Sequence, residues 1–365
     1  MKIGCVKEIK TQEYRVGLSP ENVWTLCQEG HEVWIETSAG LGSGYPDEDY
    51  LNAGASIKSS EEIWTHVDLL IKVKEPLEKE YAYFRKGLLL FTYLHLAADQ
   101  KLTQALLASG MTALAYETLS VHQSLPLLKP MSEIAGRLSI QEAAKYLEKT
   151  MGGKGLLLSG VPGVKRGHVL VLGAGVAGQN AVKIAVGMGA NVTVLDRKRD
   201  KLEELEMIYG DRIQTLSSDE ASIQALLPQV DIVVGAVLVA GAKAPQLIKR
   251  KDLSKMTKGS VLVDIAIDQG GCFETSVPTT HTNPTYEVDG IIHYCVANIP
   301  GCVPMTSTKA LTNASINYIS AIAKYGLKEA CLKYPELKSA INTHLGKCSN
   351  QAVANTFNLE FVEYA

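Results

Sequence analysis

The sequence predicts an α/β fold with two doubly wound, Rossmann-like parallel sheets, on the basis of three observations. Short apolar runs alternate with amphipathic segments of helical period along almost the whole chain, which is typical of βα units. The runs fall into two series, separated by a long helical segment that begins near Met131. At 365 residues, the chain is long enough for two domains of ordinary size.

The expected elements follow from these runs in chain order. The first series of strands covers residues 2–6, 31–36, 68–74, 88–94 and 112–119. A long helix is expected over residues 131–151, and the second series of strands covers residues 168–173, 191–196, 231–237, 260–267 and 291–297. A second long helix over residues 307–326 can return the chain to the first domain. We therefore expect a discontinuous first domain of residues 1–128 and 306–365, and a contiguous second domain of residues 129–305.

Composition and charge argue against several classes of partner. The formal net charge is −3, so neither nucleic acid nor an anionic membrane surface is expected to bind. No apolar run reaches the roughly 18–20 residues of a membrane span, and the N-terminus lacks the apolar segment of a signal peptide. The seven cysteines and eight histidines show neither C-x-x-C nor H-E-x-x-H spacing, so no metal is expected. These features favour a cytoplasmic protein with reduced thiols.

The second series opens with a dinucleotide-binding fingerprint. Gly173, Gly175 and Gly178 form G-x-G-x-x-G directly after a strand and at the start of a helix. The first glycine permits the tight turn, the second lets the backbone approach a pyrophosphate, and the third allows close helix–strand packing. The helix N-terminus offers free N–H groups and a positive dipole end to phosphates. A glycine-rich turn can also bind nothing, so the prediction depends on the strand and helix around it.

Asp196, at the end of the next strand, indicates which dinucleotide binds. A carboxylate at this spacing accepts hydrogen bonds from the adenosine ribose and repels a 2′-phosphate, which favours NAD over NADP. The following run Arg197–Lys201 leaves NADP open, because a nearby arginine can hold that phosphate; its alternative role is a solvated helix start. A methyltransferase can carry a similar turn and acidic residue, so the motif alone does not establish redox chemistry.

Asp268 is a candidate for the chemistry itself. It follows an apolar strand of the second series, where parallel strands deliver side chains to a ligand from their carboxyl ends. From there a carboxylate would face a nicotinamide. Its alternative role is that of a turn residue ahead of Gly270 and Gly271.

The first series places charged residues next to strand ends. Arg15 lies between a loop and a helix start at Ser19, and arginine is suited to hold a carboxylate in two-pronged fashion. Lys72 and Lys74 are expected on one face of a strand, where Lys74 would meet an anion or a solvent cleft. His95 ends an apolar strand and can act as acid or base. Each cation alone could equally form a surface ion pair, and His95 alone could be a core side chain.

The chain resembles the alanine dehydrogenases, a family that also includes the NAD-binding subunit of proton-translocating transhydrogenase. The resemblance covers essentially the whole chain. It rests on the ordered blocks "KEIKTQEYRVGLSP", "KVKEP", "FTYLHLA", "AYET", "PMSEIAGR", "GVPGV", "GAGVAGQNA", "VLVDIAIDQGGCFE", "VANIPGCVP" and "TSTKALTNA". These blocks are far more specific than the glycine turn.

The resemblance implies NAD-dependent oxidative deamination of L-alanine to pyruvate and ammonium with formation of NADH, and the reverse reductive amination. It also implies a cytoplasmic homohexamer with no membrane partner and an active site in the cleft between the two domains. The substrate carboxylate would be bound by Arg15 and Lys74, and the acid/base roles would fall to His95 and Asp268. The implied cofactor contacts are Ser132, Gly173, Gly175, Val176, Ala177, Gly178, Asp196, Lys201, Ser218, Val237, Leu238, Ile265, Ala266, Ile267, Asp268, Val296, Ala297, Asn298 and Ile299.

Three alternatives to an alanine dehydrogenase stay open at this point. They are the transhydrogenase subunit, a related dehydrogenase that joins lysine to 2-oxoglutarate, and an NAD sensor without catalysis. The histidine of "YLHLA" together with Arg15 and Lys74 favours the amino-acid enzyme. Met305 departs from the family pattern, which leads us to expect a basic residue there. Met131 either packs near the reacting centre or fills a gap in the core.

Overall fold

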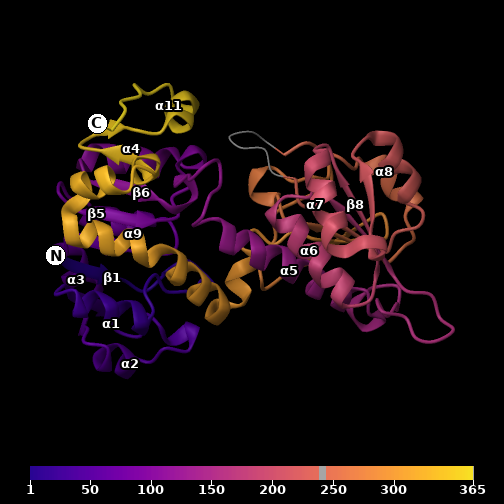
Figure 1. Ribbon diagram of the computed structural model, residues 1–365, viewed down its shortest axis with the longest axis horizontal. Helices are drawn as coiled ribbons and strands as arrows, with labels where there is room; N and C mark the ends of the chain where they lie inside the picture. Colours follow the sequence, from indigo (N-terminus) through magenta and orange to yellow (C-terminus); the bar gives the residue numbers. More distant parts are fainter. Residues whose placement is uncertain (238–243, 365) are drawn as a thin grey trace. The chain divides into compact units, whose positions relative to one another are not determined.

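Two compact units, each built around one sheet, make up the protein in the computed structural model, which describes residues 1–237 and 244–364 (Figure 1). Unit 1 combines Met1–Met131 with Val303–Ala365, and unit 2 is Ser132–Cys302. The chain therefore leaves unit 1 once and returns to it. Within the described residues, the structure holds no helix with the length and apolar character to cross a membrane.

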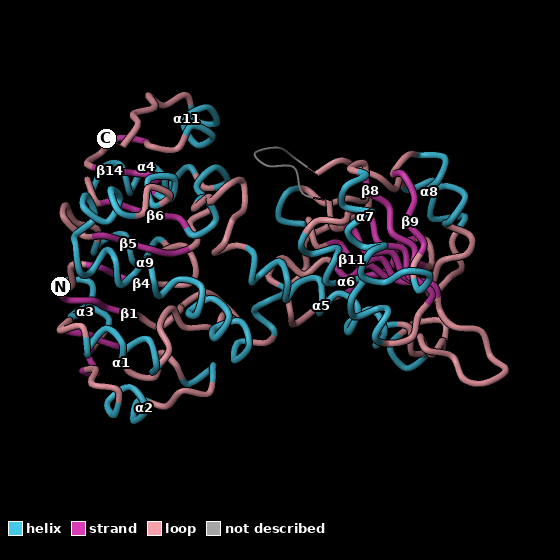
Figure 2. The backbone as a smooth tube through the Cα atoms, viewed as in Figure 1, coloured by secondary structure: helices cyan, strands magenta, loops and turns pink. Residues whose placement is uncertain are grey.

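The sheet of unit 1 is parallel except at one edge. Its strands are β1 (Lys2–Cys5), β2 (Glu32–Glu36), β3 (Ser56–Lys58), β4 (Leu69–Ile71), β5 (Leu89–Thr92), β6 (Thr112–Ala115), β14 (Ile341–His344) and β15 (Lys347–Cys348). Their order is β15–β14–β6–β5–β4–β1–β2–β3, and Figure 2 shows β14, β6, β5, β4 and β1 stacked in this order. β14 pairs antiparallel with both β6 and β15. The strand order reverses between β1 and β4, and open α/β sheets bind ligands beside such a point.

Helices connect the strands of unit 1. They are α1 (Pro20–Gln28), α2 (Asp47–Asn52), α3 (Ser60–His66), α4 (Gln100–Ser109), α9 (Pro304–Lys333), α10 (Leu337–Ala340) and α11 (Gln351–Phe357), with the short 3-10 helices η1 (Leu41–Ser43), η2 (Glu78–Tyr83), η3 (Leu96–Ala98) and η4 (Tyr116–Thr118). The predicted helix start at Ser19 is confirmed, because its hydroxyl accepts the Asn22 N–H at the N-terminus of α1. α9 carries a kink at Gly326, whose φ of 73° is not helical.

The sheet of unit 2 has the order β12–β13–β11–β10–β7–β8–β9. Its strands are β7 (His168–Leu172), β8 (Asn191–Asp196), β9 (Gln214–Ser217), β10 (Ile232–Gly235), β11 (Val261–Asp264), β12 (Thr285–Val288) and β13 (Ile291–Tyr294). All pair in parallel except β12, which is antiparallel to β13 at the edge. The strand order reverses between β7 and β10, as in unit 1.

The helices of unit 2 begin with the long segment that the sequence predicts. It forms α5 (Lys129–Tyr146), and the others are α6 (Val176–Gly187), α7 (Arg199–Tyr209) and α8 (Glu220–Leu226), with the 3-10 helices η5 (Lys149–Met151), η6 (Gly210–Arg212), η7 (Arg250–Lys255), η8 (Ile267–Gln269) and η9 (Ile299–Cys302). α5 and α6 cross closely at Gly136, since a Cβ there would lie 2.0 Å from the Ala177 carbonyl oxygen. Only glycine fits this crossing.

The central strands of both sheets are buried on both faces, which explains their continuous apolar sequences. In unit 2, Leu170, Val233 and Leu262 on three neighbouring strands are fully buried in one hydrophobic cluster. Each such side chain stabilises the fold by about 1.5–3 kcal/mol relative to an exposed position.

The predicted fold class is confirmed, but several predicted elements end earlier than expected: the strand over residues 112–119 ends at Ala115, the strand over 260–267 ends at Asp264, and the helix over 131–151 ends at Tyr146. The expected strand over residues 68–74 ends at Ile71, so Lys72 and Lys74 follow β4 rather than lying in it. Apolar character extends through Val73, which hides this end in the sequence. The sequence also misses β3, β9, β12, β14 and β15, which are short strands near sheet edges, where one face or one side is open to solvent and the apolar pattern is weak.

Candidate functional site

The glycine turn of unit 2 has the conformation that its sequence predicts. Gly173 follows β7 with a φ of 101°, which glycine adopts readily. A Cβ at Gly178 would lie 1.8 Å from the Gly173 carbonyl oxygen, so the helix packs against the strand as closely as backbone permits. Gly175 forms the N-cap of α6, and apart from its chain neighbours no atom of the described residues lies within 4 Å of the position a Cβ would take. The space in front of Gly175 is therefore open to a ligand.

Asp196 ends β8 and holds this turn in place. Its Oδ2 accepts the Ala174 N–H at 2.6 Å, and its Oδ1 accepts the Lys198 N–H at 2.8 Å. A carboxylate has about four lone-pair sites, so these two bonds leave capacity for ribose hydroxyls. The acidic residue and the glycine turn therefore form one structural unit.

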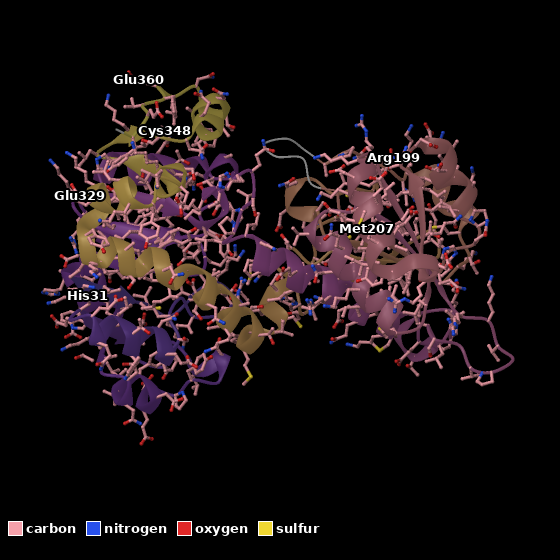
Figure 3. All side chains as sticks on the ribbon, in the orientation of Figure 1. His31, Arg199, Met207, Glu329, Cys348 and Glu360 are labelled. Atoms are coloured by element: carbon pink, nitrogen blue, oxygen red, sulfur yellow. The ribbon has the colours of Figure 1, made fainter. Side chains whose placement is uncertain are left out.

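The basic run after Asp196 forms surface ion pairs at the start of α7. Arg199 donates to Glu203 at 2.8 Å, its side chain is 90% exposed, and it lies at the outside of unit 2 (Figure 3). Lys201 donates to Glu204 at 2.7 Å, and this hydrogen bond raises the pKa of Lys201. For Arg199 the solvated-helix interpretation holds. Exposed pairs of this kind stabilise a helix only weakly.

The other predicted cofactor residues share one edge of the unit 2 sheet. Parallel strands place their carboxyl ends on the same side, beside the point where the strand order reverses. Ser218 follows β9, Val237 follows β10, Ile265–Asp268 follow β11, and Val296–Ile299 follow β13. Leu238 lies outside the described residues. Ser132 does not follow a strand; it is half-buried near the start of α5.

A buried carboxylate that the sequence does not single out organises the segment around Asp268. Asp264 ends β11 and accepts the Ala266 N–H at 3.0 Å, the Cys272 N–H at 2.7 Å and the Ser276 hydroxyl at 2.5 Å. Burial raises the pKa of Asp264, while these hydrogen bonds oppose that rise. Asp268 itself is exposed in the 3-10 helix η8. Asp264 therefore holds the loop over residues 265–272, which carries Asp268, at both of its ends.

In unit 1, Arg15 is buried and paired with Glu13. Its Nε and Nη2 donate to the two carboxylate oxygens of Glu13, each at 2.6 Å, and its Nη1 donates to the Met131 sulfur at 3.1 Å. Arg15 is 2% exposed. Burial opposes its charge, but the hydrogen bonds and charge of Glu13 outweigh burial and raise the pKa of Arg15. Met131 therefore lies against a candidate substrate-binding group.

The two lysines after β4 have different surroundings. Lys72 is fully buried, and its ammonium contacts Glu8 at 3.3 Å and Glu80 at 2.9 Å. Lys74 is half-buried, and its ammonium has no hydrogen-bond or ion-pair partner among the described residues. Burial, followed by the positive charge of Arg15, lowers the pKa of Lys74. Lys72 is structural, whereas Lys74 is a cation available to an anion.

Glu8 also sets the position of the backbone that carries Lys74. Its Oε1 accepts the N–H groups of Val73 at 2.6 Å and Lys74 at 3.2 Å. On the other side, the Thr92 hydroxyl donates to the Lys74 carbonyl at 2.9 Å. The chain around Lys74 is therefore held between the ends of β1 and β5.

His95 is exposed, so its alternative interpretation as a core side chain is wrong. It lies just after β5 with a φ of 50°, in the left-handed region. Its ring is nearly parallel to that of Tyr93, at an interplanar angle of 13° and a centroid separation of 6.2 Å. The Tyr93 hydroxyl donates to the Leu127 carbonyl at 2.6 Å, which fixes the ring beneath the imidazole.

Arg15, Lys74 and His95 thus all follow carboxyl ends of neighbouring parallel strands, β1, β4 and β5. Two cations and an imidazole that follow neighbouring strand ends can bind a small carboxylate and move a proton at the adjoining atom. Met305 is exposed at the start of α9, where it lies beside Gly44 of unit 1. Among the residues that the structure describes, no three His, Cys, Asp or Glu side chains are grouped to hold a metal ion.

Comparison with known proteins identifies family matches for both parts of the chain. The family model "Alanine dehydrogenase/PNT, N-terminal domain" matches residues 4–135, and its C-terminal counterpart matches residues 139–351. An alanine dehydrogenase from Staphylococcus epidermidis is 52% identical over 363 residues, covering 99% of this chain and 98% of the relative.

Solved structures extend the comparison to the fold. An L-alanine dehydrogenase is 49% identical with a TM-score of 0.95, covering 98% of this chain and 99% of the other. A transhydrogenase from Sinorhizobium meliloti has a TM-score of 0.83 at 24% identity, covers 96% of this chain and 100% of the other, and shows likeness of fold alone. The resemblance seen in the sequence is confirmed: the chain belongs to the alanine dehydrogenase/PNT family.

Proposed function

We propose that the chain catalyses the NAD-dependent oxidative deamination of L-alanine to pyruvate and ammonium, and the reverse reductive amination. The observation that carries the proposal is the set Arg15, Lys74 and His95 at one edge of the unit 1 sheet, in a chain half identical to an alanine dehydrogenase along its whole length. The high identity to alanine dehydrogenases along the whole chain supports an amino-acid dehydrogenase. The roles assigned below to single residues are part of the proposal.

NAD fits the residues at the edge of unit 2. The open space at Gly175 and the N-terminus of the twelve-residue helix α6 suit a pyrophosphate. The Asp196 carboxylate suits the two ribose hydroxyls. When bound, NAD supplies the hydride acceptor of the reaction. Asp268 and its neighbours on η8 are proposed to border the nicotinamide, held by the buried Asp264.

The substrate carboxylate is proposed to bind between Arg15 and Lys74. Arg15 enters this role already fixed by Glu13, so little conformational freedom is lost when the substrate binds. Positioning Cα in this way converts a bimolecular reaction into an effectively unimolecular one. Loss of hydride from Cα of the neutral amine gives iminopyruvate. Water adds to this imine and ammonia leaves, with His95 and Asp268 sharing the proton transfers.

The direct test is the formation of NADH, followed by absorbance, from purified protein with NAD and L-alanine at mildly alkaline pH. NADP, glycine and L-lysine are run in parallel. We expect turnover with alanine and NAD, and much weaker turnover with NADP. Clear NADH binding without turnover of any amino acid would contradict the proposal and favour a transhydrogenase-like nucleotide carrier.

Cofactor choice gives a prediction for Asp196. Asp196→Asn keeps an oxygen for the Ala174 N–H but removes the charge that repels a 2′-phosphate. Hydrogen bonds to a charged group contribute about 1.5–3 kcal/mol, so the NADP-to-NAD ratio of kcat/KM should rise by about 10–100-fold. Asp200→Asn, on the exposed first turn of α7, is the matched control. An unchanged ratio in Asp196→Asn would remove Asp196 from the cofactor site.

The lowered pKa of Lys74 predicts how carboxylate binding depends on pH. Lys74 binds an anion only while protonated, and it loses its proton at a lower pH than an exposed lysine does. The inhibition constant of propionate, which has the carboxylate but no amine, should therefore rise with pH through this pKa, by at most about tenfold per pH unit for one proton. Lys74→Arg should flatten this dependence, because guanidinium stays charged. The same slope in both proteins would contradict the role of Lys74.

We also propose, on the family resemblance, a cytoplasmic homohexamer. Exposed apolar side chains on the segment after η5 support self-association: Leu157 is 63% exposed and Val164 is 62% exposed. Large apolar side chains exposed together often mark protein–protein contacts. Light scattering of the purified protein measures the assembly, and a monomeric mass would contradict it.

A further inference from the structure

Glu117 makes an unusual set of contacts with the backbone at His95. It lies on η4, directly after β6. Its Oε1 accepts the His95 N–H at 2.6 Å and the Leu94 N–H at 3.1 Å, and its Oε2 lies 3.3 Å from the same Leu94 nitrogen. Hydrogen bonds between an amide and an ionised carboxylate are roughly twice as strong as neutral ones. The Glu117 carboxylate therefore binds the backbone amides of His95 and of the residue before it.

These contacts begin where the ladder between β5 and β6 ends. The last paired residues are Thr92 and Ala115, so β6 no longer supplies partners for the amides of Leu94 and His95. Glu117 supplies them from the neighbouring strand end. Because an orphaned backbone N–H is costly, this arrangement explains a carboxylate at the position.

The conformation that Glu117 holds is a strained one. His95 has φ 50° and ψ 37°, and the left-handed region costs a residue with a Cβ roughly 1–2 kcal/mol. On the other side, the His95 carbonyl accepts the Ala98 N–H at 2.9 Å, so the turn is held at both ends. Backbone angles set the direction of the side chain. Loss of the Glu117 contacts would let residue 95 relax and turn the imidazole away from the Tyr93 ring.

We propose that Glu117 is the positioning residue of the proposed acid/base group: it acts through the His95 backbone and touches neither substrate nor cofactor. This inference rests on the proposed function for its catalytic consequence. Such a role depends on the reach of the side chain rather than on its charge. Glutamine retains the reach and an acceptor oxygen, whereas aspartate retains the charge and loses the reach.

The experiment compares Glu117→Gln with Glu117→Asp. Because a misplacement of about 1 Å can cost 10²-fold in rate, we expect Glu117→Asp to lower kcat for alanine by about 10–100-fold. Glu117→Gln should stay within about fivefold of the parent, because it loses only the charge-assisted part of the hydrogen bonds. NADH affinity should be unchanged in both. Thr118→Val is the matched control, because Thr118 lies on the same η4. Its hydroxyl donates to the Ala115 carbonyl and accepts from the Asn342 side chain, but does not contact His95.

Kinetics and structure together separate the outcomes. If Glu117→Asp keeps full kcat, or falls less than Glu117→Gln, positioning by reach is wrong. If Thr118→Val falls as far as Glu117→Asp, the effect belongs to η4 in general and the proposal is overturned. Crystal structures of the variants give a second readout: residue 95 should leave the left-handed region in the aspartate variant alone. If residue 95 leaves the left-handed region in the aspartate variant but the parent protein does not oxidise alanine, Glu117 still positions His95 and the proposed function is wrong.

Discussion

His95→Ala should lower kcat for alanine oxidation by about 10²–10⁴-fold, the usual contribution of a positioned acid/base group. The side chain is exposed, and its ring contact is with Tyr93 alone among the ring pairs of the described chain. Its removal should therefore leave folding and NADH binding nearly unchanged. Steady-state kinetics, NADH fluorescence titration and thermal unfolding measure the three quantities on one preparation.

His122→Ala is the matched control for this variant. His122 is also exposed and also has a positive φ, of 46°, so it reproduces the backbone conformation and the loss of an imidazole. It should keep the kcat of the parent protein. If His95→Ala also keeps that kcat, the acid/base role has to be reassigned, with Asp268 the next group to test.

Arg15→Ala should affect stability and substrate binding together. The Glu13 side chain is fully buried, and without Arg15 it would be left as a buried charge that has lost its bidentate partner. Breaking a buried ion pair in this way costs about 3–5 kcal/mol. KM for alanine should rise as well, because a cation that binds the carboxylate is lost. The midpoint of denaturant unfolding and the alanine KM give the two effects.

A double variant separates the two effects of Arg15. Arg15→Met with Glu13→Gln removes both charges at similar volume, and replacing a buried pair by neutral groups is often close to neutral for stability. The double variant should therefore recover most of the unfolding midpoint while KM for alanine stays high. Recovery of KM together with stability would mean that Arg15 serves the fold of unit 1 and not the substrate.

The parts of the site that the sequence predicts are local in the chain. The conformations of Gly173 and Gly178 follow from one strand–turn–helix unit, and Asp196 comes one strand later. Their spacing is set by the geometry of a βα turn, so the pattern can be read without tertiary contacts. The order of the blocks was enough to predict the family, and the comparisons confirm it. The individual roles at the site stay predictions.

The two lysines after β4 show where a pattern stops being informative. The strand pattern places Lys72 and Lys74 two residues apart on one face, and Lys74 is singled out mainly by the family resemblance. In the structure Lys72 is neutralised by Glu8 and Glu80, and the Lys74 ammonium is left without a partner among the described residues. The difference depends on Glu8, which lies 64 residues before Lys72 in the chain and contacts it only in the folded protein. No local pattern encodes such a contact.

Carboxylates that are buried or half-buried against the backbone are the class of residue that the sequence does not single out. Glu13, Glu117 and Asp264 each hold a candidate site residue or its segment in place. In a sequence, a glutamate near a strand end looks like an ordinary surface charge, because most glutamates are exposed. Only the folded structure shows that these carboxylates are matched with backbone amides or with a guanidinium.

The sequence by itself determined the fold class, because the alternation of apolar runs and the glycine turn are short-range properties of the chain, and its ordered blocks predicted the family. The tertiary structure decided which of the candidate groups are available for chemistry. It buried Lys72 and left Lys74 half-buried, and it exposed His95 in a left-handed turn held by Glu117. Availability depends on desolvation and on partners brought together by the sheet, and both exist only once residues distant in the chain have packed.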